Sequence, residues 1–255
     1  MSVDILRALA QRGLRVFDYS ELAEMAQTLG LKKSYIPALA ALMIKNGELV
    51  SLYKGIYALP LEFLAGGPLH SFEIAMKIAK KGAISHRSAL SYYELTDQVI
   101  SKIYVTVPKE RGANLSTKKL YEINGVNYEL IRIAPQHYWG VKTIFIGEAR
   151  IRITDLERTL IDGLSRPEAC GGFREVLFAY EKGISKISPT TILSYAEKTS
   201  LAVCKRLGLI FETLDVYQDI QKQIKSMPMP YTQRLDAAGP RRGKVIKHWN
   251  LLENI

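Results

Sequence analysis

The chain has 255 residues, of which 47% are hydrophobic, and its formal net charge is +10 at pH 7. This length and composition predict a globular protein with one large domain or two modest ones. The sequence contains no run of about 18 apolar residues, and its first residues include an acid and arginines, which excludes a membrane span and a signal peptide. We therefore expect a soluble, cytoplasmic protein with no membrane partner.

The cysteines indicate no metal site, and the charges indicate which kind of partner the protein would bind. Cys170 and Cys204 stand alone and lack the CxxC or Cys/His spacing of zinc sites, so both are expected to be buried apolar side chains. The basic surplus favours phosphate polymers or anionic surfaces as partners. Its largest share lies in residues 67–150, with 12 Lys and Arg against 7 Asp and Glu.

Three helices are predicted in the first 46 residues. Apolar side chains recur at helical spacing in residues 3–13, 21–30 and 34–46. Ser20 is the expected N-cap of the second helix, and Pro37 is tolerated in the first turn of the third.

A β-hairpin is predicted directly after these helices. Residues 48–59 alternate in polarity and are rich in β-branched and aromatic side chains, with Lys54-Gly55 as the turn. Three helices followed by a hairpin, with a short glycine-containing turn between the second and third, is the order of a winged helix-turn-helix. We assign this unit to residues 1–62.

Prolines and glycines between residues 60 and 69 predict the boundary of a second domain, residues 69–255. Periodicity there predicts helices in residues 71–82 and 86–95, after Asp155 and through most of the remainder. It predicts strands at 102–107, 128–133, 142–147 and 150–154, and a loop at 228–244. The expected fold class is α+β, an N-terminal winged helix-turn-helix followed by a mixed α/β C-terminal domain.

The start of the third helix and the hairpin turn carry the residues expected to bind DNA. A recognition helix contacts bases through its first residues, and basic side chains nearby contact phosphates. This predicts DNA contacts from Lys32, Lys33, Ser34 and Tyr35, with Lys54 reaching the backbone or the minor groove. A winged helix also serves as a protein-interaction module, so that alternative stays open.

A second alternative comes from the segment "ITDLERTLID". Asp155, Glu157 and Asp162 are clustered carboxylates of the kind that bind Mg²⁺ in nucleic-acid enzymes. The structural alternative is that Thr154 and Glu157 form a capping box and that Arg158 pairs with Asp162 four residues on. We favour the structural interpretation, because a metal site would require further ligands.

The segment "AISHRSAL" contains serines and a histidine but no nucleophile elbow and no acid at an identifiable distance. Ser85 is therefore expected to be a helix N-cap, with His86 and Arg87 in an exposed first turn.

Several stretches also point to one family. They are the segment ending in "KGIYALP", followed by "AISHRSALSYYELTDQ", "VTVPKERG", "IRITDLERTLIDGLSRPEACGGFREVL", "RLGLIFE" and "GKVIKHWNLLEN". In this order, and over nearly the whole chain, they resemble the AbiEi-type antitoxins of bacterial type IV toxin–antitoxin systems, which act in phage abortive infection.

The resemblance implies a two-domain antitoxin and transcriptional autorepressor without catalytic activity, cofactor or metal. It implies binding to double-stranded repeats in the protein's own promoter through the N-terminal domain, and antitoxicity from the C-terminal domain. The functional partner would be a nucleotidyltransferase-like toxin, without need for a stable complex. Basic residues of the second domain then form a possible second phosphate-contacting face, namely Lys80, Lys81, Arg87, Lys109 and Arg111.

Overall fold

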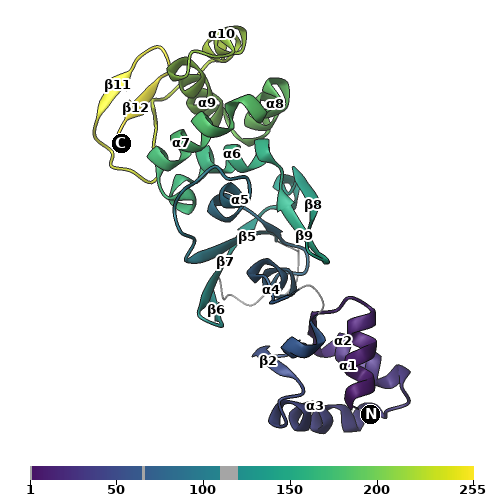
Figure 1. Ribbon diagram of the computed structural model, residues 1–255. Coiled ribbons are helices and arrows are strands. Elements are labelled where there is room, and N and C mark those ends of the chain that lie inside the picture. Colours follow the sequence, from purple (N-terminus) through teal and green to yellow (C-terminus); the bar gives the residue numbers. More distant parts are fainter. Residues whose placement is uncertain (1, 65–66, 110–119) are drawn as a thin grey trace.

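The computed structural model describes residues 2–64, 67–109 and 120–255 (Figure 1). The fold is a mixed α+β arrangement of helices and three β-sheets. The molecule is elongated, with the N-terminal unit at one end, a central sheet, and a mainly helical unit at the other end (Figure 1). Among the described helices, none is both long and apolar enough to cross a membrane.

The N-terminal unit packs three helices against a small antiparallel sheet. Its elements are α1 (Ser2–Gln11), β1 (Val16–Asp18), α2 (Tyr19–Thr28), α3 (Ile36–Lys45), β2 (Val50–Tyr53) and β3 (Ile56–Ala58). β3 pairs with both other strands, so Tyr57 is opposite Phe17 on one side and Ser51 on the other. The expected helices and hairpin are present, and β1 is an additional strand whose three residues are too few to give a recognisable alternation.

The N-cap of α2 is Asp18 and not, as expected, Ser20. The Oδ1 of Asp18 accepts the backbone N–H of Glu21 at 3.0 Å, and the Oε2 of Glu21 accepts the backbone N–H of Asp18 at 2.7 Å. Two donors are satisfied in this reciprocal capping box, whereas a cap by Ser20 would satisfy one, because Ala23 three residues on has no acceptor side chain. The Ser20 hydroxyl instead donates to Asp18.

The central unit is a six-stranded mixed sheet with the order β6-β7-β5-β4-β9-β8. Its elements are α4 (Ser71–Ile78), β4 (Ala83–Ile84), α5 (His86–Tyr92), β5 (Lys102–Pro108), β6 (Leu120–Ile123), β7 (Val126–Ile133), β8 (Val141–Ile146) and β9 (Ala149–Thr154). The four predicted strands are confirmed. β4 and β6 were not predicted, and β4 is the central link, because it pairs with β5 on one side and with β9 on the other.

The N-terminal unit is joined to the central unit by apolar and ionic contacts. Leu52 and Ile56 of the hairpin belong to the same buried cluster as Phe72 of α4. Three ion pairs lie at the same junction: Arg15 with Glu73, Glu21 with Lys77, and Asp18 with Lys80. Glu73, Lys77 and Lys80 recur at helical spacing. One face of α4, together with Lys80 just after the helix, is therefore directed at the N-terminal unit.

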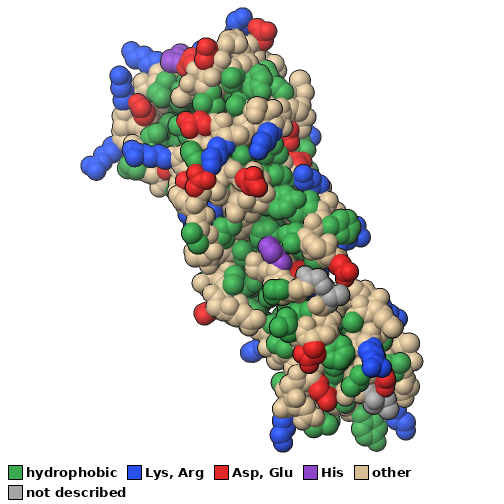
Figure 2. All heavy atoms as spheres, viewed as in Figure 1, with side chains coloured by type: hydrophobic (Ala, Val, Ile, Leu, Met, Phe, Trp, Pro, Cys, Tyr) green, Lys and Arg blue, Asp and Glu red, His purple; other side chains and the backbone are tan. Residues whose placement is uncertain are grey.

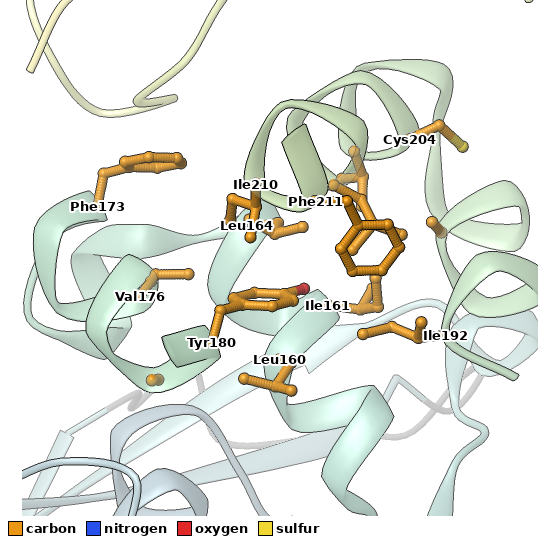
Figure 3. Close-up of a cluster of buried hydrophobic side chains, with 14 of the residues drawn as sticks. Leu160, Ile161, Leu164, Phe173, Val176, Tyr180, Ile192, Cys204, Ile210 and Phe211 are labelled. Atoms are coloured by element: carbon orange, nitrogen blue, oxygen red, sulfur yellow. The ribbon is translucent and has the colours of Figure 1, made fainter. Parts of the chain in front are cut away.

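The C-terminal unit consists of α6 (Leu156–Ser165), α7 (Phe173–Gly183), α8 (Pro189–Thr199), α9 (Leu201–Thr213) and α10 (Gln218–Ser226), with a small sheet of β10 (Gln233–Arg234), β11 (Lys244–Ile246) and β12 (Leu251–Glu253). Tyr180 and Phe211 are fully buried in its core (Figure 3). Both cysteines are buried, as expected. The segment 228–244 contains β10 and the start of β11, so the loop prediction was wrong there.

The last strands are held to the helices by close packing. A Cβ added at Gly208 of α9 would lie 2.3 Å from Cζ3 of the fully buried Trp249, so only glycine permits this approach. The Arg206 guanidinium donates to the carbonyl oxygens of Leu164 and Arg234 at 2.9 and 2.8 Å. The main hydrophobic core among the helices is distinct from the one on the sheet, and the sheet core also includes Leu52 and Ile56 of the N-terminal unit.

Candidate nucleic-acid interface and a polar pocket

The residues predicted to contact bases lie in the turn that precedes α3. Residues Lys33–Tyr35 form a single turn of 3₁₀ helix, and the α-helix begins only at Ile36. Lys32, Lys33 and Ser34 are exposed, and Tyr35 is 62% exposed. In the described part of the chain, neither lysine pairs with an acidic side chain. Both ammonium groups are therefore free to meet an anion.

The outward face of α3 itself is apolar. Ile36, Ala40 and Met43 are buried, which leaves Ala38, Ala41 and Lys45 on the opposite side, with Leu42 53% exposed beside them. Hydrogen-bonding side chains are thus confined to the two ends of this face. Such a surface admits close approach of another molecule but offers mainly methyl groups along its length.

Lys54 lies apart from the other residues that were predicted to bind DNA. The carbonyl oxygen of Gly55, next to it in the hairpin turn, accepts the backbone N–H of Tyr19 at 2.9 Å, so this turn lies at the start of α2. Lys32 follows the end of the same ten-residue helix. The two sites are therefore separated by a helix of about 15 Å.

The predicted second phosphate-contacting face does not form one surface. β4 is antiparallel to β5, so Lys109, which follows β5, lies at the same edge of the sheet as Lys80 and Lys81, which precede β4. Arg87 follows β4 and lies at the opposite edge. Arg111 is outside the described residues.

Lys80 is occupied by an ion pair within the molecule. Burial opposes ionisation of Asp18, but hydrogen bonds from Lys80, Ser20 and the backbone of Glu21 outweigh it and lower the pKa of Asp18 to about 2. The same contact raises the pKa of Lys80. Lys80 therefore fastens the N-terminal unit to the sheet, a role that appears only when the two segments meet in space.

Three further basic residues lie at this junction, Lys77, Arg150 and Arg152, and none of them was among the predicted binding residues. A depression of about 290 Å³ is lined by Lys77, Lys80, Arg150 and Arg152, with Glu21 among them. Arg152 is anchored by a 2.8 Å hydrogen bond from its Nε to the carbonyl oxygen of Gly82. The arginines stand two apart on β9, and this alternation is the one sequence signal that could have placed them on a common face.

Each of the three carboxylates of "ITDLERTLID" accepts a hydrogen bond from within the fold. Asp155 is the N-cap of α6, since it accepts the backbone N–H of Arg158 at 2.7 Å and the Tyr195 hydroxyl at 3.0 Å. Glu157 accepts the backbone N–H of Ser188 at 2.8 Å, and Asp162 accepts from Arg158 Nε at 2.7 Å. The predicted pair of Arg158 and Asp162 is thus confirmed.

The N-cap of α6 is Asp155 and not Thr154, so the expected capping box of Thr154 and Glu157 was wrong. Asp155 takes the cap because a carboxylate next to the first turn also gains from the helix dipole, and the Thr154 hydroxyl is 2.7 Å from that of Thr159 instead. Within residues 2–64, 67–109 and 120–255, no three His, Cys, Asp or Glu side chains are arranged to hold a metal ion.

Arg158 and Asp162 are part of a polar pocket between the sheet and the helices. Their side chains are only 7% and 8% exposed. Arg158 Nη1 donates to the His137 carbonyl oxygen at 2.9 Å, and its guanidinium carbon lies 3.9 Å from the centre of the Trp139 ring. A charged side chain held by an acid, a carbonyl and an aromatic face is fixed in one orientation.

His86 lies in the wall of the same pocket and is buried, contrary to the expectation of an exposed first turn. Ser85 occupies the N-cap position of α5, as predicted, but its hydroxyl makes no capping bond and lies 2.9 Å from His86 Nδ1. Two segments that the sequence presents separately, "AISHRS" and "TDLERTLID", therefore meet at one site. Pairing of β4 with β9 and packing of α5 against α6 bring them together.

The sequence matches no protein-family model and no curated protein sequence. Among solved structures, the fold is similar to that of the Rv2827c protein from Mycobacterium tuberculosis, with a TM-score of 0.65 at 13% sequence identity. The similarity covers 97% of this chain and 89% of that chain. At this identity the likeness concerns the fold alone.

Proposed function

We propose that this protein is a DNA-binding antitoxin and transcriptional autorepressor of a type IV toxin–antitoxin operon. In this proposal, residues 1–62 are a winged helix-turn-helix that binds repeats in the protein's own promoter. The remainder opposes a nucleotidyltransferase-like toxin, with no requirement for a stable complex. Support comes from the order of α1, α2, α3 and the β2–β3 hairpin, and from the stretches that resemble AbiEi-type antitoxins.

The observation that carries the proposal is the exposed basic turn before α3. Lys32 and Lys33 extend from it without acidic partners in the described part of the chain, beside the exposed hydroxyls of Ser34 and Tyr35. Lysines here would neutralise phosphates at the edge of the major groove, while the shorter Ser34 reaches base edges.

The apolar face of α3 suggests how sequence would be read. Ala38 and Ala41 carry only methyl groups, which bring the helix close to the groove floor, where the thymine methyl group is the one apolar feature. Discrimination would then rest on thymine positions under Ala38 and Ala41, with hydrogen bonds to bases supplied by the residues at the helix start.

The decisive experiment is fluorescence anisotropy with a labelled duplex from the protein's own upstream region and a scrambled duplex, over a series of salt concentrations. We expect at least about a hundredfold preference for the native duplex and an affinity that falls steeply with salt. Lys33→Ala should weaken binding to both duplexes, whereas Ser34→Ala and Tyr35→Ala should alter the preference. Lys222→Ala, an exposed lysine on α10, is the matched control.

Equal, weak binding to both duplexes would refute the repressor proposal. The protein-interaction alternative would then gain from one specific feature, the exposed apolar side chains Leu42, Ile44 and Val50 at the end of α3 and the start of β2. A stable stoichiometric complex with the product of the neighbouring gene, blocked by Leu42→Asp, would support that second function.

A further inference from the structure

The polar pocket is a cavity of about 280 Å³ whose chemistry is not explained by DNA binding. Its lining residues include ones from α5, the end of β7 and α6. Figure 1 shows α5 and α6 on the side of the central sheet that faces away from the N-terminal unit. Its wall includes His86, Thr106, Trp139, Arg158, Asp162 and Arg166. Concave sites with a few converging polar groups are the usual places for small ligands.

One polar atom of this wall lacks a partner. Asp162 Oδ1 accepts from Arg158, but Asp162 Oδ2 is buried and has no hydrogen-bond partner among the described residues. Buried carboxylate oxygens are nearly always paired, because their hydration is lost on folding. The unpaired oxygen therefore marks a position where a ligand donor, such as a hydroxyl group, would be stabilised.

His86 supplies a hydrogen-bond donor to the same cavity. The Thr106 hydroxyl donates to Ser85 Oγ at 2.8 Å, which leaves the Ser85 proton available to His86 Nδ1, 2.9 Å away. This arrangement favours the tautomer that carries the imidazole proton on Nε2. Burial lowers the pKa of His86, although the charge of Asp162 opposes this, and so favours the neutral ring. His86 also has a φ of 52°, a strained conformation for a residue with a side chain.

The charge of the wall favours an anion. Arg158 and Arg166 contribute two guanidinium groups against the single carboxylate of Asp162. Arg158 is already held by its partners, whereas Arg166 is half-exposed, and in the described part of the chain its Nε contacts Glu168 at 3.3 Å. Arg166 is therefore the cation able to turn toward a bound group, and arginine suits phosphate because its planar fork matches two oxygens.

We propose that this pocket binds a phosphate monoester of a small hydroxyl-bearing molecule, such as a sugar phosphate or a nucleoside monophosphate. Arg166 and the Nε2–H of His86 donate to the phosphate, and Asp162 Oδ2 accepts from a hydroxyl group of the ligand. This site is separate from the proposed DNA-binding surface and does not depend on it.

The test is isothermal titration of the full-length protein with ribose 5-phosphate, AMP, inorganic phosphate and ribose. We expect one of the two organic phosphates to bind at least tenfold more tightly than inorganic phosphate, and ribose not to bind. Arg166→Ala should weaken the organic phosphate at least tenfold. Arg174→Ala, which removes an exposed arginine of α7 outside this pocket, should leave binding unchanged.

Two further variants separate the roles of the donors and the acceptor. Asp162→Asn should weaken the organic phosphate more than inorganic phosphate, because it alters the hydroxyl acceptor. His86→Gln should weaken both, and it serves as the independent test if Asp162→Asn fails to fold by circular dichroism. Absence of binding at millimolar concentration, equal binding of inorganic phosphate, or no effect of Arg166→Ala would each overturn the proposal.

Discussion

Replacing Arg158 by methionine tests whether the pair with Asp162 organises the junction of sheet and helices. Methionine keeps the unbranched stem that packs against Gly140 but removes the guanidinium. Three contacts are lost: the 2.7 Å bond to Asp162, the 2.9 Å bond to the His137 carbonyl and the stacking on Trp139. Because Asp162 is then buried as an unpaired charge, the expected loss is about 3–5 kcal/mol of unfolding free energy.

Urea denaturation followed by circular dichroism and tryptophan fluorescence measures this loss. At a slope of about 1–3 kcal/mol per molar urea, the midpoint should fall by at least about 1 M. The double variant Arg158→Met with Asp162→Leu removes both charges and should recover at least half of the loss. Lys222→Ala, which breaks an exposed pair with Asp219, should leave the midpoint unchanged.

A cost below about 1 kcal/mol for Arg158→Met would refute the reasoning, because an uncompensated carboxylate cannot be buried so cheaply. A double variant no more stable than the single one would also refute it. Either result would mean that the helix start at Asp155 and the packing of α6 are sufficient to hold this junction.

Three further outcomes follow from the contacts described. Hydrogen bonds from Lys225, His248 and Trp249 outweigh the effect of burial and lower the pKa of Glu212 to about 2. The stabilisation of the fold by ionised Glu212 is therefore present above about pH 4.5 and is lost as pH falls toward 2. Thermal melts should therefore show less acid sensitivity in Glu212→Gln than in the wild type over that range; identical profiles would contradict this. Lys33→Ala should reduce the salt dependence of DNA binding by about one phosphate contact, whereas Lys80→Ala, paired with Asp18, should not. Replacing thymine by deoxyuracil in the native duplex should weaken binding if Ala38 and Ala41 contact thymine methyl groups, and an unchanged affinity would exclude such contacts.

Local patterns were sufficient to predict much of the secondary structure. α1, α2, α3 and the hairpin follow from apolar spacing and turn residues, which depend on neighbours in the chain. Two of the errors occurred where two local signals competed, at Asp18 against Ser20 and at Asp155 against Thr154. In both places a carboxylate took the helix cap that a hydroxyl residue was expected to hold.

Long-range pairing decided the rest. β4 has two residues and no periodicity, yet it joins β5 to β9 and so places His86 beside Arg158 and Asp162. The same sheet puts Arg87 and Lys80 at opposite edges, although they are seven residues apart in sequence. Side-chain identity along the chain could not reveal either result.

The sequence by itself determined the helix–hairpin order of the first 60 residues, the basic turn at Lys32 and Lys33, and the pairing of Arg158 with Asp162. These features depend on contacts within about four residues or within one hairpin. Tertiary structure alone decided that Lys80 is neutralised by Asp18, that α3 presents methyl groups outward, and that a polar pocket forms around Asp162 Oδ2. Charge pairing and burial between distant segments depend on the three-dimensional arrangement of the chain, and linear spacing does not encode it.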